Sequence, residues 1–177
     1  MSEPAICPDT LAGQLEALHR ESFAWALACC AHHAHDAEEV LQMSYLKALE
    51  GRARFEGRSA FKTWLFGVIR MTAREQRRRV WWRWVRQVRA GEGRECATDD
   101  DSPDDAMARG EEIARVRAAC DRLSSRQRQV LMLVFHHELS LDEAAAVMGV
   151  SPGSARQHYH RGKEQLRGLL GGSFSNP

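Results

Sequence analysis

Two helix-start signals lie near the C-terminal end of the sequence, and a single glycine between them marks the end of the first helix. This arrangement constrains the fold more than any other feature. Ser140 is followed three residues later by Glu143, which is the layout of a capping box at the start of a helix. Gly149 can adopt the left-handed conformation that ends such a helix. Ser151 can then cap a second helix, with Pro152 at its first position. Two short helices joined by so tight a turn are typical of a helix-turn-helix unit.

The second of these helices has two chemically different sides. At about 100° per residue, Ala155, Tyr159, Gly162 and Leu166 fall on one side, which we expect to pack. Arginine can bind guanine edges and glutamine can bind adenine edges in the major groove, so the opposite, polar side is predicted to read DNA. The residues predicted to make these contacts are Ser154, Arg156, Gln157, His160 and Arg161.

Composition divides the 177-residue chain into three zones. Residues 91–112 are acidic and nearly free of bulky apolar side chains, so they cannot bury enough surface to offset their ordering entropy. They are predicted to be a flexible linker, either a solvated tether or a segment that threads a basic channel. Helical periodicity flanks the linker and no alternating strand pattern persists. The predicted fold class is therefore all-α, with two small helical domains at residues 11–90 and 113–171.

The first zone is predicted to contain three or four helices. One covers residues 11–30, Asp36 caps the next, Gly51 ends it, and Ser59 or Thr63 starts another. This last helix is expected to bury Phe61, Leu65, Val68, Ile69 and Thr72 and to leave Arg70, Arg74, Arg77 and Arg78 in solvent.

The run RRRVWWRWVRQVR interleaves arginine with aromatic residues at the end of the same zone. This composition can hold phosphates and stack on exposed bases. The dense positive charge favours a polyanionic partner, because like charges repel one another without one. For Trp81, Trp82 and Trp84 we expect burial in the core of the small domain, since tryptophan usually buries most of its area.

The five cysteines are odd in number and irregular in spacing, which argues against a disulfide framework. Cys29 and His33 would share a helix face, so a metal- or redox-sensing site involving Cys30 and the nearby histidines is one alternative. No second ligand pair with metal-site spacing is present, and we predict neither a metal nor a cofactor. The sequence also lacks a convincing catalytic arrangement, and His136 and His137 are expected to face solvent.

The chain as a whole carries a formal net charge of +1, so any electrostatic partner must depend on the local distribution of charge. No apolar run approaches the ~20 residues needed to span a bilayer. The N-terminal stretch MSEPAICPDT lacks the basic-then-apolar layout of a secretion signal. We therefore expect a cytoplasmic protein without membrane insertion.

Three segments together resemble the minimal two-domain sigma factors of bacterial RNA polymerase, the extracytoplasmic-function (ECF) class of the sigma-70 family. They are HDAEEVLQMSYLKAL, RFEGRSAFKTWLFGVIRMTAREQRRR and LSSRQRQVLMLVFHHELSLDEAAAVMGVSPGSARQHYHRGKEQL. The resemblance implies a non-catalytic subunit that binds core RNA polymerase and directs promoter recognition, DNA melting and transcription initiation under the control of an anti-sigma factor. A stand-alone helix-turn-helix transcriptional regulator is the alternative.

The resemblance also implies roles for individual residues. Asp36, Glu38, Glu39 and Gln42 would contact the β′ clamp helices of core polymerase, whose β flap is a further expected contact. The polar side of the last helix would read the minus-thirty-five element. Met71 stands where the family commonly has asparagine, so a side-chain amide able to bond a base or a phosphate is absent. Minus-ten recognition and melting would fall to Phe55, Arg58, Ser59, Phe61, Lys62, Trp64, Arg70, Arg74 and Arg77.

Overall fold

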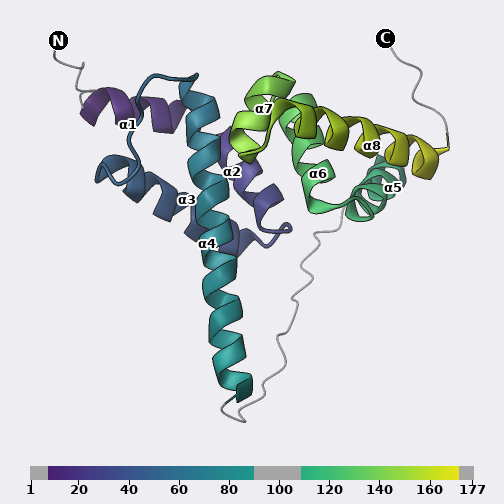
Figure 1. The fold of residues 1–177 in the computed structure, drawn as a ribbon, viewed down its shortest axis with the longest axis horizontal. Coiled ribbons are helices and arrows are strands. Elements are labelled where there is room, and N and C mark those ends of the chain that lie inside the picture. Colours follow the sequence, from purple (N-terminus) through teal and green to yellow (C-terminus); the bar gives the residue numbers. More distant parts are fainter. Residues whose placement is uncertain (1–7, 90–108, 172–177) are drawn as a thin grey trace. The chain divides into compact units, whose positions relative to one another are not determined.

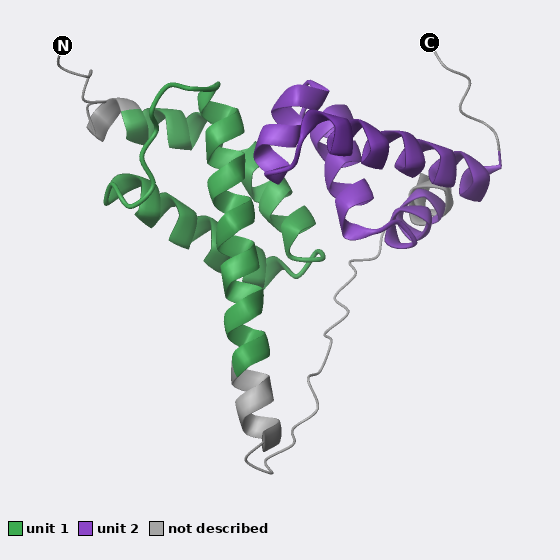
Figure 2. Cartoon of the chain, in the orientation of Figure 1, with its two compact units in different colours: residues 1–100 green, residues 101–177 purple. Residues whose placement is uncertain are grey.

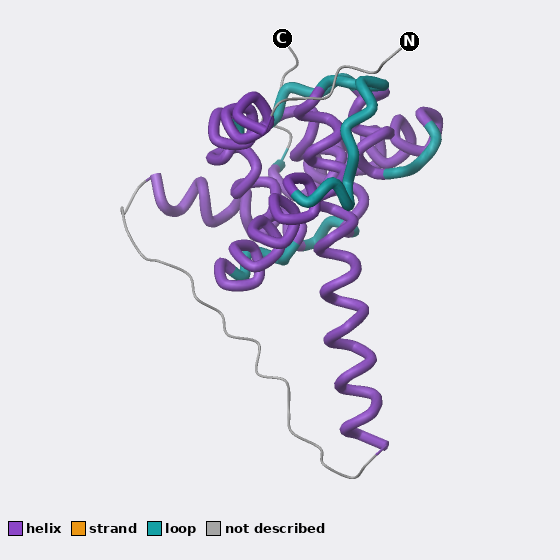
Figure 3. Tube along the Cα trace, turned by 90° about the vertical axis from the view of Figure 1, so that its left-hand side faces the viewer, coloured by secondary structure: helices purple, strands orange, loops and turns teal. Residues whose placement is uncertain are grey.

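The structure is a computed structural model that describes residues 8–89 and 109–171. The chain divides into two compact units, residues 1–100 and 101–177 (Figure 2). Helices joined by short loops make up the described stretches, and no strand occurs within them (Figure 3). The prediction of an all-α fold with two helical domains is confirmed. No helix in the described part of the chain combines the length and the apolar character required to cross a bilayer.

Four helices make up the described part of the N-terminal unit (Figure 1). They are α1 (Pro8–Ala17), α2 (His19–Cys29), α3 (Ala34–Leu49) and α4 (Phe61–Arg89). The single helix predicted over residues 11–30 is interrupted at Leu18, whose backbone leaves the helical region with φ −96° and ψ 4°. This break allows α1 to pack against both α2 and α3. Helix α4 begins between Ser59 and Thr63, the two predicted starting points.

The core of this unit forms where α2, α3 and α4 pack together. Trp25 of α2 and Phe66 of α4 are fully buried, and their rings stack with centroids 5.8 Å apart. The Trp25 indole N–H donates a hydrogen bond of 3.0 Å to the Phe66 carbonyl, so its buried polar atom is satisfied. Of the residues predicted to point inward from α4, Leu65, Ile69 and Thr72 are buried, whereas Phe61 and Val68 are half-buried.

The predictions for Asp36 and Arg70 in the N-terminal unit are wrong. Asp36 is not the N-cap of α3, because the helix begins at Ala34 and His33 occupies the cap position. Asp36 lies in the first turn, where its negative charge still interacts favourably with the helix dipole. Arg70 is not solvated but only 7% exposed, because it lies one turn after Phe66 on the buried side of α4.

The tryptophans near the end of α4 also differ from the prediction. Trp81 and Trp82 are 57% and 55% exposed rather than buried. Helix α4 is 29 residues long and extends past the other helices of its unit (Figure 1), so these two rings lie beyond the core that forms around Trp25. Trp84, which was also predicted to be buried, lies outside the residues whose side chains are described.

The C-terminal unit is built from α5 (Arg109–Asp121), α6 (Ser125–Leu131), the π-helical turn η1 (Met132–His136), α7 (Leu141–Met148) and α8 (Pro152–Leu170). Helix α5 begins inside the predicted linker, residues 91–112, so the last four residues of that segment are helical. Three of these four residues are arginine or glutamate, which have high helix propensity, so a polar composition does not prevent a helix. The rest of the predicted linker lies outside the described residues.

Helix α8 packs against α5, α6 and α7. Gly162 permits a close approach to α6, because a Cβ atom at this position would lie 2.9 Å from Leu131 Cδ1. The prediction that His137 faces solvent is wrong, since the residue is buried, whereas His136 is exposed. The backbone N–H of His137 donates a hydrogen bond to the carbonyl of Met132, five residues earlier in the chain. This wide π-helical turn brings the ring inward.

Candidate nucleic-acid interface

Helices α7 and α8 form a helix-turn-helix whose geometry follows the predicted caps. The Ser140 hydroxyl accepts the Glu143 backbone N–H at 3.2 Å, and the Glu143 carboxylate accepts the Ser140 backbone N–H at 2.9 Å. Gly149 ends α7 in the left-handed region with φ +61°, and Ser151 caps α8 by accepting the Ser154 N–H at 3.2 Å. The predicted capping box, turn glycine and second cap are therefore confirmed.

Helix α8 turns one face inward and the other to solvent. Ala155 and Gly162 are buried on the inner face, where Tyr159 and Leu166 are half-buried. Ser154 is half-buried, and its hydroxyl lies 2.9 Å from the Ser151 hydroxyl, so this side chain belongs to the cap of the helix. The remaining residues predicted to read DNA are all exposed: Arg156, Gln157, His160 and Arg161.

Two contacts that were not predicted order the side chains around this exposed face. Arg156 Nη2 donates a hydrogen bond of 3.2 Å to Asp142 Oδ1 on α7, and both side chains are exposed. The Tyr159 ring stacks on the exposed Phe135 ring at 5.9 Å and meets the His160 ring edge-on at 5.7 Å. Asp142 and Phe135 precede α8 in the chain, so periodicity within α8 alone gives no signal for either contact.

An aromatic cluster lies at the start of α4. The Phe55 ring is 5.4 Å from the rings of both Phe61 and Trp64, and these last two rings are 5.2 Å apart. All three residues are half-buried, so part of each ring remains accessible to solvent. Gly57, with φ +70°, supplies the left-handed turn that returns the chain from Phe55 toward α4. The cluster therefore combines a tight loop with accessible aromatic surface.

The polar residues predicted to hold DNA near this cluster differ in their exposure to solvent and in their ion pairs within the protein. Arg58 is exposed and lies 2.9 Å from Glu56. Lys62 is half-buried and ion-paired with Glu21 at 2.5 Å, so its charge is already matched. Arg70 is buried, and a contact between its guanidinium and DNA would require the side chain to leave the core. The other exposed residues of the predicted set are Ser59, Arg74 and Arg77.

The outward side of α3 carries both acidic and apolar residues. Every residue predicted to bind core polymerase is exposed there, namely Asp36, Glu38, Glu39 and Gln42. Glu39 also accepts a hydrogen bond of 2.7 Å from Gln76 on α4. Met43, Leu46 and Leu49 lie on the same side and are between 40% and 52% exposed. These three residues were not among those predicted to bind a partner. Exposed apolar residues that lie together in this way are typical of a surface to which another protein binds.

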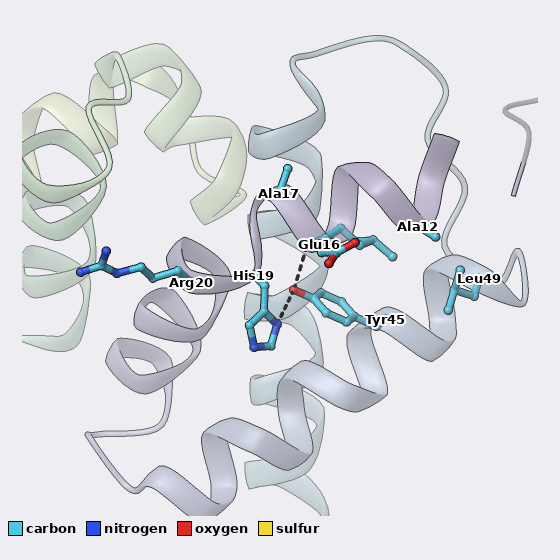
Figure 4. A pocket seen from close by; sticks show the side chains of 8 residues that line it. Ala12, Glu16, Ala17, His19, Arg20, Tyr45 and Leu49 are labelled. Carbon is cyan, nitrogen blue, oxygen red and sulfur yellow. Dashed lines mark hydrogen bonds between the residues drawn. The ribbon is translucent and has the colours of Figure 1, made fainter. Parts of the chain in front are cut away.

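A hollow of about 580 Å³ lies among α1, α2 and α3 (Figure 4). The Tyr45 hydroxyl lies 3.4 Å from both the Leu15 carbonyl and His19 Nδ1 at its wall. Burial raises the pKa of Tyr45, so its phenol remains protonated at neutral pH. The lining residues come from three helices, which explains why no single sequence pattern predicted the hollow: Ala12, Leu15, Glu16, Ala17, His19, Arg20, Tyr45 and Leu49.

The segment rich in cysteine and histidine gives no support to a sensing site. Burial, together with the neighbouring Cys30, raises the pKa of Cys29 to about 12, and burial raises the pKa of Cys30 to about 11. Both thiols therefore stay protonated near neutral pH, which disfavours metal ligation and oxidation. Within the described residues, no three cysteine, histidine, aspartate or glutamate side chains are grouped so that they could hold a metal ion.

The described residues form two helical units, and one of them contains a helix-turn-helix whose second helix exposes arginine, glutamine and histidine side chains. These features are typical of an all-α DNA-binding protein. Comparison with known proteins narrows this class. Residues 15–83 match the family model of sigma-70 region 2, and residues 113–166 match that of sigma-70 region 4. The chain is 33% identical over 141 residues to the RNA polymerase sigma factor CarQ of Myxococcus xanthus, which covers 76% of this chain and 75% of CarQ.

The chain therefore belongs to the sigma-70 family of RNA polymerase sigma factors, in its ECF class. Two solved structures share its fold. RpoE in complex with the anti-sigma factor NepR, from Bartonella quintana, superposes with a TM-score of 0.72 at 24% identity, covering 92% of this chain and 98% of RpoE. CnrH in complex with the cytosolic domain of CnrY superposes with a TM-score of 0.63 at 23% identity, covering 95% of this chain and 92% of CnrH. The family assignment supports an ECF sigma factor over a stand-alone helix-turn-helix regulator.

Proposed function

We propose that this sigma factor is a dissociable, non-catalytic subunit that binds core RNA polymerase in the cytoplasm and directs it to promoters. The observation that carries the proposal is the exposed face of α8, where Arg156, Gln157, His160 and Arg161 lie together behind a rigidly capped turn. Side chains at the N-terminal part of a second helix are the ones that enter the major groove in helix-turn-helix proteins. We assign this face to the minus-thirty-five element.

Arg161→Ala tests the reading role of this face. The substitution should cost about 1–3 kcal/mol of discrimination between the cognate promoter and a mismatched one, if the guanidinium contacts a base edge. The measurement is competitive binding of the polymerase complex to promoters that differ in the minus-thirty-five element. Arg167→Ala, an exposed arginine in the last turn of the same helix, is the matched control and should leave discrimination unchanged. An equal loss on all sequences would make Arg161 a phosphate contact.

The aromatic cluster at the start of α4 is proposed to act in promoter opening. Unstacking a base from duplex DNA costs a few kcal/mol. A base that leaves the duplex can stack on the accessible surfaces of Phe55, Phe61 and Trp64, and this contact offsets part of that cost. Arg58 and Arg74 are exposed nearby on the loop and on α4 and can hold the phosphates of the displaced strand. Hydrogen bonds between base pairs are broken in this step but no covalent bond is, so opening requires no catalytic group from this chain.

The outward side of α3 is proposed to bind core polymerase through the β′ clamp helices, while the C-terminal unit meets the β flap. The double substitution Asp36→Lys with Glu39→Lys should abolish association with core polymerase and leave the fold intact, because both carboxylates are exposed. Co-purification with core enzyme measures the effect, and circular dichroism checks the fold. The control Glu138→Lys with Glu164→Lys makes the same charge change at exposed sites in the other unit. Association of the first variant at wild-type strength would contradict the assignment.

An anti-sigma factor is proposed as the second partner of the same side of α3. The solved structures of RpoE and CnrH contain NepR and the cytosolic domain of CnrY, respectively. In this chain, the exposed Met43, Leu46 and Leu49 provide apolar area that a partner helix could cover. A partner bound there would exclude core polymerase, because both would need the same exposed residues.

A further inference from the structure

A second hollow, of about 210 Å³, lies between the loop that joins α2 to α3 and the middle of α4. Its acidic lining residue is Asp36 of α3, and its arginine is Arg77 of α4. The volume exceeds the ~10–15 Å³ that one buried water needs and falls below the ~300–1,000 Å³ of sites for drug-sized ligands. The hollow therefore suits a molecule of the size of a small metabolite.

Two opposite charges line this hollow from different helices. Asp36 and Arg77 are both exposed, and within residues 8–89 neither side chain takes part in an ion pair or a hydrogen bond. Both charges nevertheless act on one thiol, because burial raises the pKa of Cys30, Asp36 raises it further and Arg77 lowers it. A carboxylate and a guanidinium that line one space without pairing can hold a ligand with the complementary charges.

Apolar side chains provide a surface on which the hydrocarbon part of such a ligand can pack. Val40 of α3 and Ala73 of α4 are buried at the hollow, and Val80 of α4 is 45% exposed. The amide of Gln76, which also lines the hollow, already donates a hydrogen bond to Glu39 at 2.7 Å. The hollow thus offers a negative group, a positive group and an apolar surface within a small volume.

Backbone hydrogen bonds hold the loop that forms one wall of the hollow. The His32 N–H donates to the Leu27 carbonyl at 2.9 Å, and the His33 N–H donates to the Cys30 carbonyl at 3.2 Å. Ala31 and His32 lie in the left-handed region, with φ +54° and +67°, where a residue with a side chain is strained. Strained backbone persists only where its surroundings hold it, and such positions cluster at ligand sites. The wall is therefore formed before a ligand binds.

We propose that this hollow binds a small zwitterion with an aliphatic part, of the class of the α-amino acids. Arg77 holds the carboxylate of the ligand through paired N–H donors, Asp36 holds its ammonium group, and the apolar wall covers its aliphatic part. A simple anion fits less well because Asp36 repels it, and a simple cation fits less well because Arg77 repels it. Binding of this ligand requires neither a thiolate nor a cluster of metal ligands, and it does not depend on the proposed function.

Isothermal titration calorimetry on the full-length chain tests the site, with L-valine and L-leucine as probes. At least one of them should bind with a Kd of about 1 mM or below. The analogues without the amino group are isovalerate and isocaproate, and those without the carboxylate are isobutylamine and isoamylamine. Each analogue should bind about ten-fold more weakly than its parent amino acid, or worse, because one charge-assisted contact is lost.

Substitutions assign each charge of the ligand to a side chain. Asp36→Asn and Arg77→Gln should each weaken binding of the amino acid by about ten-fold or more. Asp36→Asn should not weaken binding of the analogue without the amino group, and Arg77→Gln should not weaken binding of the analogue without the carboxylate. Glu16→Gln and Arg78→Gln are the matched controls, since they remove the same charges from exposed residues outside the hollow, and they should have no effect.

Three results would overturn the proposal: no binding of either amino acid, an analogue that binds as tightly as its parent, or unchanged binding by Asp36→Asn or Arg77→Gln. Binding of inorganic phosphate without binding of an amino acid would also overturn it and would identify an anion site. Circular dichroism checks the fold of each variant, and the comparison of analogues uses the unmodified chain and does not depend on any variant. The titration contains neither polymerase nor DNA, so its failure is distinct from a failure of the chain to join core polymerase.

Discussion

Asp142 places a negative charge beside the side chains that are proposed to read DNA. Its carboxylate accepts a hydrogen bond from Arg156 across the turn between α7 and α8. The capping box fixes the backbone of this first turn of α7, so the acid is held in place rather than carried by a mobile loop. Because the pair is exposed, its own contribution to stability is small. The main effect of Asp142 is that its carboxylate competes with DNA for the guanidinium of Arg156.

Asp142→Asn should therefore raise the affinity of the C-terminal unit for all DNA sequences, by about two- to five-fold, and reduce its discrimination among them. The substitution removes a charge that repels phosphates and competes for Arg156. Affinity measured against salt concentration on matched and mismatched promoters gives both effects. Asp121→Asn breaks the comparable ion pair with Arg128, at 3.3 Å between α5 and α6, and should leave DNA binding unchanged. A loss of affinity in Asp142→Asn would show that the acid only orients Arg156.

Glu138 occupies a backbone conformation that favours glycine. It follows η1 with φ +56°, in the left-handed region where a side chain is strained. Glu138→Gly should stabilise the C-terminal unit by about 0.5–1 kcal/mol, since relief of strain exceeds the extra entropy of glycine in the unfolded chain. Urea unfolding measures the change. Glu164→Gly, the same substitution at an exposed α-helical position of α8, should destabilise by about 1 kcal/mol, and matching signs for the two variants would contradict this interpretation.

The exposure of a single residue was predictable from the sequence where its side-chain chemistry and its position on the helix agree. Arg156 and Gln157 were predicted to face solvent from their side of the helix, and they do. The prediction failed for Arg70, which a charge-based argument placed in water, and for Trp81, which an argument from average burial placed in the core. Burial depends on how far neighbouring helices extend beside the residue. The sequence of a single helix does not show how far its neighbours extend.

At the scale of helices, a glycine permits the close packing of α8 against α6. Helix α8 passes α6 so near that a Cβ at position 162 would be 2.9 Å from Leu131 Cδ1 and 3.3 Å from Gln127 Cβ. Contacts at these distances require neighbouring atoms to move. Gly162 therefore permits α8 to approach α6 closely, and the same helix carries the exposed face that is proposed to read DNA.

Gly162→Ala should destabilise the C-terminal unit by about 1–3 kcal/mol, because the added methyl group overpacks the contact with α6. Thermal unfolding followed by circular dichroism measures the loss. Gly168→Ala provides the control, since a Cβ at that site meets nothing within 4 Å in the same helix. It should stabilise by up to about 1 kcal/mol through helix propensity alone. Equal shifts for the two variants would mean that packing against α6 does not limit the substitution.

Helix boundaries were predictable where a side chain marks them. Ser140, Gly149 and Ser151 each carry local chemistry for a cap or a turn, and the structure places the boundaries of α7 and α8 at them. The break at Leu18 and the π-helical turn after Leu131 have no such marker. Hydrophobic periodicity alone therefore does not locate them.

At the scale of the whole molecule, the proposed tasks are distributed over the two units of the chain. The N-terminal unit carries the acidic and apolar side of α3, the aromatic cluster and the exposed arginines of α4. The C-terminal unit carries the exposed face of α8 that is proposed to read duplex DNA. Neither unit offers a metal cluster within its described residues, and the buried thiols are protonated. Selection of a promoter is the task proposed for this chain, and synthesis of RNA is that of the polymerase to which it is proposed to bind.

Reconstituted transcription with core RNA polymerase on a library of random promoter sequences tests this central claim most directly. The account predicts that adding the chain directs initiation to one subset of sequences, which share two short elements separated by a fixed spacing, and that core enzyme alone shows no such preference. Initiation that is equally distributed over the library with and without the chain would contradict it.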